Sequence, residues 1–219
     1  MSIADKIKEF HAELPADVTL VAISKTKPNE DLMEAYKAGQ RVFGENKIQE
    51  MEQKHEDLPK DIKWHMVGHV QRNKVKYMAG FVDLIHAVDS LKLLKEIEKQ
   101  AKKHDRTVEC LLQIKIAEED TKYGITVDEA KTILNSETYG KMSHVKIVGL
   151  MGMATLTEND AKIRQEFSFL KTTFDDLKKD RESFEILSMG MSGDYKIALE
   201  CGSNMIRVGS SIFGERNYN

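Results

Sequence analysis

Short apolar runs rich in β-branched and aromatic residues alternate with amphipathic stretches along the whole chain. Apolar runs of roughly four to eight residues, bounded by turn residues, are typical of buried strands. Such runs recur often enough to predict eight strands, at VTLVAIS (18–24), RVFGEN (41–46), IKWHMVG (62–68), FVDLIHAV (81–88), TVECLLQIKI (107–116), VKIVGLM (145–151), FEILSMG (184–190) and MIRVGSS (205–211).

The segments between these runs carry the spacing of helices. Residues 3–14 place apolar side chains on one face and predict an extra helix before the first strand, and residues 163–177 predict the longest helix. Ser90 is a predicted N-cap, the pair Thr126–Glu129 forms a predicted capping box, and Gly39 ends the helix after the first strand. The final helix, beginning at 210 or 211, is only a stub.

Alternating strands and helices predict a parallel sheet with right-handed crossovers. Eight units favour a closed (β/α)8 TIM barrel of class α/β, formed by residues 1–219 as a single domain. An open doubly wound sheet is the alternative, but it favours a glycine-rich turn after the first strand, where this chain has Ser24-Lys25-Thr26-Lys27.

Composition narrows the functional class. The net charge of −3 over 219 residues argues against a nucleic-acid partner, which selects a basic surface. Apolar runs are too short to span a membrane, and the N-terminal stretch lacks the apolar centre of a signal peptide. The two cysteines lie far apart and outside any paired motif, which is typical of a reduced, cytoplasmic protein.

Lys25 stands at the predicted carboxyl end of the first strand, where barrels of this type place their chemistry. It has two interpretations. A lysine here can extend its ammonium to the rim and serve only solubility. Alternatively, apolar surroundings lower the pKa of an amine and make it a nucleophile able to form an imine. Lys27, beyond the strand and before Pro28, is predicted to be solvated.

The loops after the seventh and eighth strands predict an anion site. Ser192 and Gly193 precede one predicted helix, and Gly209 with Ser210 precedes the terminal stub. Helix N-termini offer unpaired N–H groups, glycine admits close approach, and serine adds a hydroxyl donor. Each serine alone could be a plain N-cap, whereas both on adjacent loops favour a phosphate.

Arg207 lies within the eighth strand and needs a partner there. That partner is either a carboxylate of the barrel interior or an acceptor atom on a ligand. Because arginine only donates, it would keep a pyridine nitrogen unprotonated. An amine, a phosphate cradle and a ring-facing arginine together describe a pocket for pyridoxal 5'-phosphate (PLP).

The sequence resembles the pyridoxal phosphate homeostasis proteins, also called the proline-synthase co-transcribed family, which are single-domain relatives of the alanine racemase barrel. The resemblance covers nearly the whole chain and rests on the segments AISKTK, FGENKIQE, WHMVGHVQRNK, IHAVDS, GLMGM, LSMGMSGD and GSNMIRVGSSIFGER. It implies a fold-type III PLP-binding barrel. Ala87 and Asn204 depart from the family pattern, and Ser210 keeps a hydroxyl where threonine is frequent.

The resemblance also implies roles for individual residues. Lys25 matches the lysine that holds PLP as a Schiff base, and Arg207 matches the arginine facing the pyridine nitrogen. The other implied cofactor residues are Asn46, His65, Met151, Ser192, Gly209 and Ser210. A metal at His65 and His69 is not favoured, because a strand would spread the pair over roughly 13 Å.

The family likeness implies a monomeric protein that buffers or carries PLP in the cell, with PLP-dependent apo-enzymes as recipients and no established turnover. The alternative is an amino-acid racemase or a related imine-forming enzyme. Racemases of this fold use a tyrosine from a second domain as an opposing base. The chain ends soon after the eighth strand, so no such domain is expected.

Overall fold

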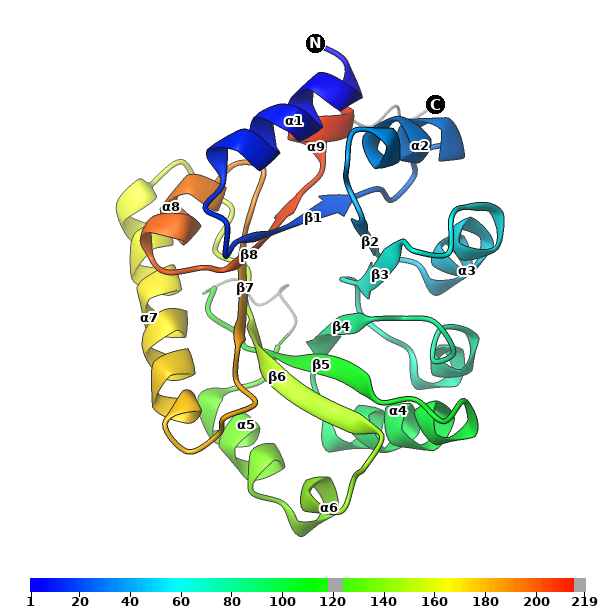
Figure 1. The fold of residues 1–219 in the computed structure, drawn as a ribbon. Coiled ribbons are helices and arrows are strands. Elements are labelled where there is room, and N and C mark those ends of the chain that lie inside the picture. The colour runs from blue at the N-terminus through cyan, green and yellow to red at the C-terminus, as the bar shows by residue number, and fades with distance from the viewer. Residues whose placement is uncertain (118–123, 215–219) are drawn as a thin grey trace.

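The computed structural model describes residues 1–117 and 124–214 and confirms the predicted barrel. Eight parallel strands close in sequential order, with β8 pairing back to β1 (Figure 1). The strands are β1 Thr19–Ile23, β2 Val42–Glu45, β3 Lys63–Met66, β4 Leu84–Val88, β5 Val108–Gln113, β6 Val145–Met151, β7 Ile186–Met191 and β8 Met205–Val208.

Helices surround the barrel on its outer face (Figure 1). They are α1 Ile3–Glu13, α2 Asn29–Lys37, α3 Ile48–Asp57, the 3-10 helix η1 Arg72–Tyr77, α4 Leu91–Lys103, α5 Val127–Leu134, α6 Glu137–Gly140, α7 Asp160–Lys178, α8 Tyr195–Glu200 and α9 Ser210–Phe213. The extra N-terminal helix α1 packs against α2 and α9, so the first and last helices of the described chain lie together.

The local helix signals act as predicted. Ser90 accepts the N–H of Leu93 at the start of α4, and Thr126 with Glu129 forms a reciprocal capping box at α5. Gly39 has a φ of 106°, a left-handed conformation that glycine adopts without strain, and it ends α2. The apolar face of α7, from Ile163 to Leu177, is buried.

Three connections differ from the simple alternating pattern. The segment after β3 forms a 3-10 helix rather than an α-helix. A short helix, α6, follows α5 before the chain enters β6. Ser192 does not cap α8, because Asp194 occupies that position and the helix begins at Tyr195.

Alternate strand residues face two separate apolar regions. One region lies between the sheet and the helices and includes Leu20 and Ala22 of β1. The other fills the barrel and includes Val21, Leu111 and Val148. The inner surface also carries polar side chains, described below, so the interior is not uniformly apolar.

Gly149 shows how tightly the sheet is built between β6 and β7. Its φ is 156°, and a Cβ at this position would lie 1.8 Å from the carbonyl oxygen of Ile186. Only glycine allows this approach between the two backbones. Within the described residues, no helix is long and apolar enough to cross a membrane.

Candidate functional site at the carboxyl end of the barrel

The loop after β1 places Lys25 at the carboxyl mouth of the barrel. Val21 and Ile23 point inward, and Lys25 follows in a turn that the N–H of Lys27 closes onto the carbonyl oxygen of Ser24. The Lys25 side chain is partly buried. Thr26, which follows, has a φ of 63°, a left-handed conformation that is uncommon for a non-glycine residue. Such backbone persists where neighbouring contacts fix it.

A partly buried ionic cluster fixes the backbone on both sides of Lys25. Lys54 of α3 donates to the carbonyl oxygen of Ser24 at 2.8 Å, to Glu45 Oε1 at 2.8 Å and to Glu50 Oε1 at 2.7 Å. Ser24 Oγ donates to Glu45 Oε1 at 2.6 Å, and the N–H of Thr26 donates to Glu50 Oε1 at 2.6 Å. We call these residues, Ser24, Thr26, Glu45, Glu50 and Lys54, the lysine-loop clamp.

The electrostatics of the clamp are dominated by burial. The Glu45 side chain is fully buried, and its Oε2 has no hydrogen-bond partner within the described residues. Burial raises the pKa of Glu45, and the opposing attraction of Lys54 does not cancel this effect. Glu45 therefore depends on Lys54 to stay ionised in the interior.

Lys27 is partly buried and hydrogen-bonded, whereas the sequence predicts a solvated side chain. Its Nζ donates to the carbonyl oxygen of Phe213 at 2.8 Å, at the end of α9. The C-terminal carbonyls of a helix lack intrahelical partners and attract a cation. The contact ties the loop after β1 to the loop and helix that follow β8.

The predicted phosphate residues come together on the β7 and β8 loops. The N–H of Gly209 donates to Ser192 Oγ at 3.2 Å, which joins the two loops directly. A Cβ on Gly209 would lie 3.3 Å from both the Cβ and the carbonyl oxygen of Ile23, so the β8 loop also presses against the end of β1. Ser210 begins α9, where first-turn N–H groups have no intrahelical acceptor.

Arg207 is buried at the barrel interior, with 4% of its surface exposed. Its Nη1 donates to Ser188 Oγ at 2.6 Å and its Nη2 donates to the carbonyl oxygen of Gly152 at 3.0 Å. Its hydrogen-bond partners are therefore a hydroxyl and a carbonyl rather than a carboxylate. Burial lowers the pKa of Arg207 to about 10, which leaves it cationic at neutral pH.

The three remaining predicted residues occupy different surroundings. Asn46 follows β2, and its Oδ1 is buried with no hydrogen-bond partner among the described residues. Met151, at the end of β6, is 1% exposed and pairs in register with Ser188. His65 lies within β3, and its Nδ1 is 3.0 Å from Nε2 of His86. Of the eight predicted residues, Lys25, Ser192, Gly209, Ser210 and Arg207 therefore gather around β1, β7 and β8.

Cavities lie at both ends of the barrel. One of about 210 Å³ is bordered by Asn46 and Lys74 beyond β2 and β3. A second, of about 430 Å³, is at the amino ends of the strands, and His65 faces it together with Lys63 and Arg106. His65 thus reaches the end of the barrel opposite to Lys25.

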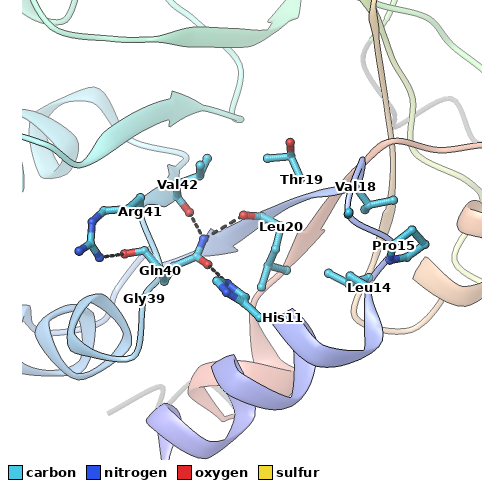
Figure 2. A pocket seen from close by; sticks show the side chains of 11 residues that line it. His11, Leu14, Pro15, Val18, Thr19, Leu20, Gly39, Gln40, Arg41 and Val42 are labelled. Atoms are coloured by element: carbon cyan, nitrogen blue, oxygen red, sulfur yellow. Dashed lines mark hydrogen bonds between the residues drawn. The ribbon is translucent and has the colours of Figure 1, made fainter.

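A third cavity, of about 280 Å³, lies between α1 and the amino ends of β1 and β2 (Figure 2). Gln40 Nε2 donates to the carbonyl oxygens of Leu20 and Val42, at 2.9 and 2.6 Å. The amide oxygen of the same side chain, Gln40 Oε1, accepts from His11 Nε2 at 2.9 Å. These bonds join α1 to the two strands, and we regard this cavity as structural.

Sequence reasoning missed the residues that support the predicted site. Lys54 and Glu50 appear in the sequence as charges of a polar helix, and Glu45 as a charge at the end of the preceding strand, and only the fold brings the three together. His86 and Ser188 carried a usable signal, since each is a polar residue inside an apolar strand. Within the described residues no group of three or more histidine, cysteine or acidic side chains is placed to hold a metal ion.

Comparison with known proteins adds a family to this geometry. Residues 2–217 match the family described as alanine racemase, N-terminal domain. The pyridoxal phosphate homeostasis protein of Aquifex aeolicus is 38% identical over 201 residues, covering 91% of this chain and 87% of that protein. The protein of the same name from Pasteurella multocida is 37% identical over 212 residues, covering 92% and 88%.

Solved structures agree with this assignment. PipY of Synechococcus elongatus PCC7942, solved with PLP bound, is 33% identical with a TM-score of 0.88, and the match covers 97% of this chain and all of that one. Alanine racemase from E. faecalis, at 14% identity and a TM-score of 0.68, shares the fold over 98% of this chain and 58% of its own. The chain therefore belongs to the family of pyridoxal phosphate homeostasis proteins, built on the barrel of the alanine racemase N-terminal domain.

Proposed function

We propose that this protein binds PLP reversibly through Lys25 and acts as a cellular buffer and carrier of the cofactor. The observation that carries the proposal is the meeting of the Lys25 loop with the Ser192, Gly209 and Arg207 positions at one end of the barrel. The relatives' name and the PLP-bound PipY structure support PLP as the ligand.

The donor set fits the cofactor. Ser192 and Ser210 offer hydroxyl groups, and the start of α9 offers backbone N–H groups, which together suit a phosphate dianion. Asn46 Oδ1 is a buried acceptor in need of a donor. The space beside Gly209 is also narrow, because a side chain at this position would crowd Ile23.

Each residue then has a physical role. PLP supplies an aldehyde that condenses with a primary amine, so that the amine nitrogen replaces the aldehyde oxygen and water leaves. Lys25 is the amine, and the lysine-loop clamp holds the backbone on both sides of it. Ser192, Gly209 and Ser210 hold the phosphate, Asn46 and Met151 border the ring, and Arg207 faces the ring nitrogen.

Arg207 limits how strongly the bound ring can act as an electron sink. A cationic guanidinium has no proton acceptor, so it can only donate to the ring nitrogen and keeps that nitrogen unprotonated. An unprotonated ring withdraws electrons poorly, which disfavours removal of a substrate proton. We therefore propose reversible binding without efficient turnover.

Borohydride trapping tests the covalent bond. The wild-type protein, loaded with PLP, should be yellow and should carry the reduced adduct on Lys25 by peptide mass spectrometry. Lys25→Ala should lose the colour and the adduct, whereas Lys92→Ala, which changes an exposed lysine of α4, should keep both. Normal cofactor occupancy in Lys25→Ala would refute the role of this lysine.

A transfer assay tests the carrier. Loaded protein is mixed with the apo form of a PLP-dependent enzyme, and the recovery of enzyme activity is compared with that from an equal amount of free PLP. We expect complete recovery. Retention of PLP without transfer would refute the carrier, and sustained racemisation of L-alanine on chiral chromatography would favour the enzyme.

A further inference from the structure

A row of buried polar side chains crosses the barrel interior from β8 to β3. Arg207 Nη1 is 2.6 Å from Ser188 Oγ, Ser188 Oγ is 3.1 Å from His86 Nδ1, and His86 Nε2 is 3.0 Å from His65 Nδ1. All four residues are at most 5% exposed. Buried polar groups persist when their hydrogen bonds are satisfied, so the direction of each bond can be worked out.

Arginine fixes the direction at the first link. A guanidinium has donors only, so Ser188 Oγ accepts from Arg207. The single hydroxyl hydrogen of Ser188 is then available for His86 Nδ1, the other polar atom within hydrogen-bond distance of Ser188 Oγ. If His86 donated instead, the serine hydrogen would be buried without an acceptor, at a cost of about 1–3 kcal/mol.

The same logic continues through the two imidazoles. His86 accepts on Nδ1, so as a neutral ring it carries its hydrogen on Nε2 and donates to His65 Nδ1. His65 in turn carries its hydrogen on Nε2. Since His65 borders the amino-end cavity, this last donor has solvent within reach.

Both rings are held in the neutral form that this order requires. Burial lowers the pKa of His65 to about 3, and burial with the nearby His65 and Arg207 lowers the pKa of His86 well below its usual value. A proton added to either ring would place two donors against each other within the row.

We propose that Ser188 and His86 are positioning residues, which hold Arg207 toward the cofactor ring through a hydrogen-bond chain that runs in one direction from Arg207 to His65. The inference rests on the proposed function, because it takes Arg207 as the residue that faces the ring nitrogen. The carbonyl oxygen of Gly152 holds Nη2 of the same guanidinium. The bond from Nη1 to Ser188 then sets how the guanidinium is rotated about that contact.

The first test needs no cofactor. Long-range 1H–15N spectra of the histidine-labelled protein without PLP report which ring nitrogen carries hydrogen. We expect His65 and His86 as neutral Nε2–H tautomers, assigned by His65→Gln and His86→Gln. In Ser188→Ala, His86 Nδ1 loses its donor, and we expect its 15N resonance to shift while the ring stays the Nε2–H tautomer, because that hydrogen still donates to His65. Finding His86 cationic or as the Nδ1–H tautomer in the wild type would overturn the chain.

The second test measures the loaded protein. Ser188→Ala should bind PLP about tenfold more weakly, since a hydrogen bond to a charged group is lost, and should shift the visible absorbance maximum. Ser203→Ala is the matched control. It removes another buried serine, whose Oγ contacts the backbone of Leu187, Met189 and Met205, and should change stability only.

The outcomes separate the two proposals. Unchanged affinity and absorbance in Ser188→Ala, or an equal change in Ser203→Ala, would overturn the positioning role. If the wild-type protein took up no PLP, the proposed function would fail, and the positioning of Arg207 toward that cofactor would fail with it. The tautomers would still decide the direction of the chain.

Discussion

Replacing Lys54 by methionine should destabilise the barrel strongly although Lys54 belongs to no strand. Lys54 is 6% exposed, Glu45 is fully buried, and the two are joined at 2.8 Å. Methionine keeps the length and most of the volume of the lysine stem. The substitution therefore removes the charge and three hydrogen bonds while leaving the packing nearly unchanged.

The expected cost is about 3–5 kcal/mol at pH 8, the usual penalty for removing one partner of a buried ion pair. The cost is high here because Glu45 Oε2 already has no partner among the described residues. The free energy of unfolding of a typical domain is roughly 5–15 kcal/mol. The Lys54→Met protein should therefore remain folded, with a much smaller free energy of unfolding.

Urea unfolding followed by fluorescence provides the assay. Trp64 is the single tryptophan, fully buried on β3 beside Phe43, so its emission reports the barrel. Lys141→Met is the matched control. It breaks an exposed pair with Glu137, and it should cost less than about 1 kcal/mol.

The pH dependence gives a second check with a defined sign. Burial already raises the pKa of Glu45 above its unfolded value of about 4.3, and removal of Lys54 takes away the main opposing attraction, so the pKa should rise further. A carboxyl group with a raised folded-state pKa loses stability as pH rises through that pKa. The cost of Lys54→Met should therefore be smaller at pH 5 than at pH 8, and the added substitution Glu45→Gln should recover most of it. A cost below about 1 kcal/mol that does not vary with pH would refute the reasoning.

Three further predictions follow from the described geometry. Gly149→Ala should abolish soluble expression because its Cβ would overlap a backbone carbonyl, whereas Gly140→Ala, with open space around it, should express normally. Acidification from pH 6.5 to 5 should lower the free energy of unfolding, because His65 and His86 have depressed pKa values in the folded state and bind more protons when unfolded. Each histidine contributes up to about 1.4 kcal/mol per pH unit. A free energy of unfolding, measured with urea, that does not change over this pH range would contradict their burial as neutral rings. Thr126→Ala should cost about 1 kcal/mol by removing the capping box of α5, measured as a lower urea midpoint, and an unchanged midpoint would show that the cap contributes nothing.

The fold was predictable because its signals are local. Strand runs, helical spacing and caps such as Ser90 each depend on a few neighbouring residues, and they agree with one another along the chain. The positions of candidate site residues were predictable where they follow strand ends, as for Lys25 and Gly209. Lys27 was mispredicted because its partner, the carbonyl of Phe213, lies 186 residues away.

The supporting residues were harder to predict because register decides them. His65 meets His86 only through the stagger of β3 against β4, and the stagger is not encoded in either run alone. Lys54 follows Ile48 and Met51 at a spacing of three on the buried face of α3, but this register alone does not show that its ammonium pairs with Glu45. Which charged side chains pair in the folded protein could therefore be determined only from the structure.

The pairing of β8 with β1 has a consequence for biosynthesis. Translation delivers β1 early, but one of its two hydrogen-bonding edges waits until residues 205–208 have left the ribosome. During that interval the nascent chain presents an open strand edge to other polypeptides, a hazard that the finished barrel removes. Ribosome-associated chaperones should accordingly release this protein only after its last strand emerges.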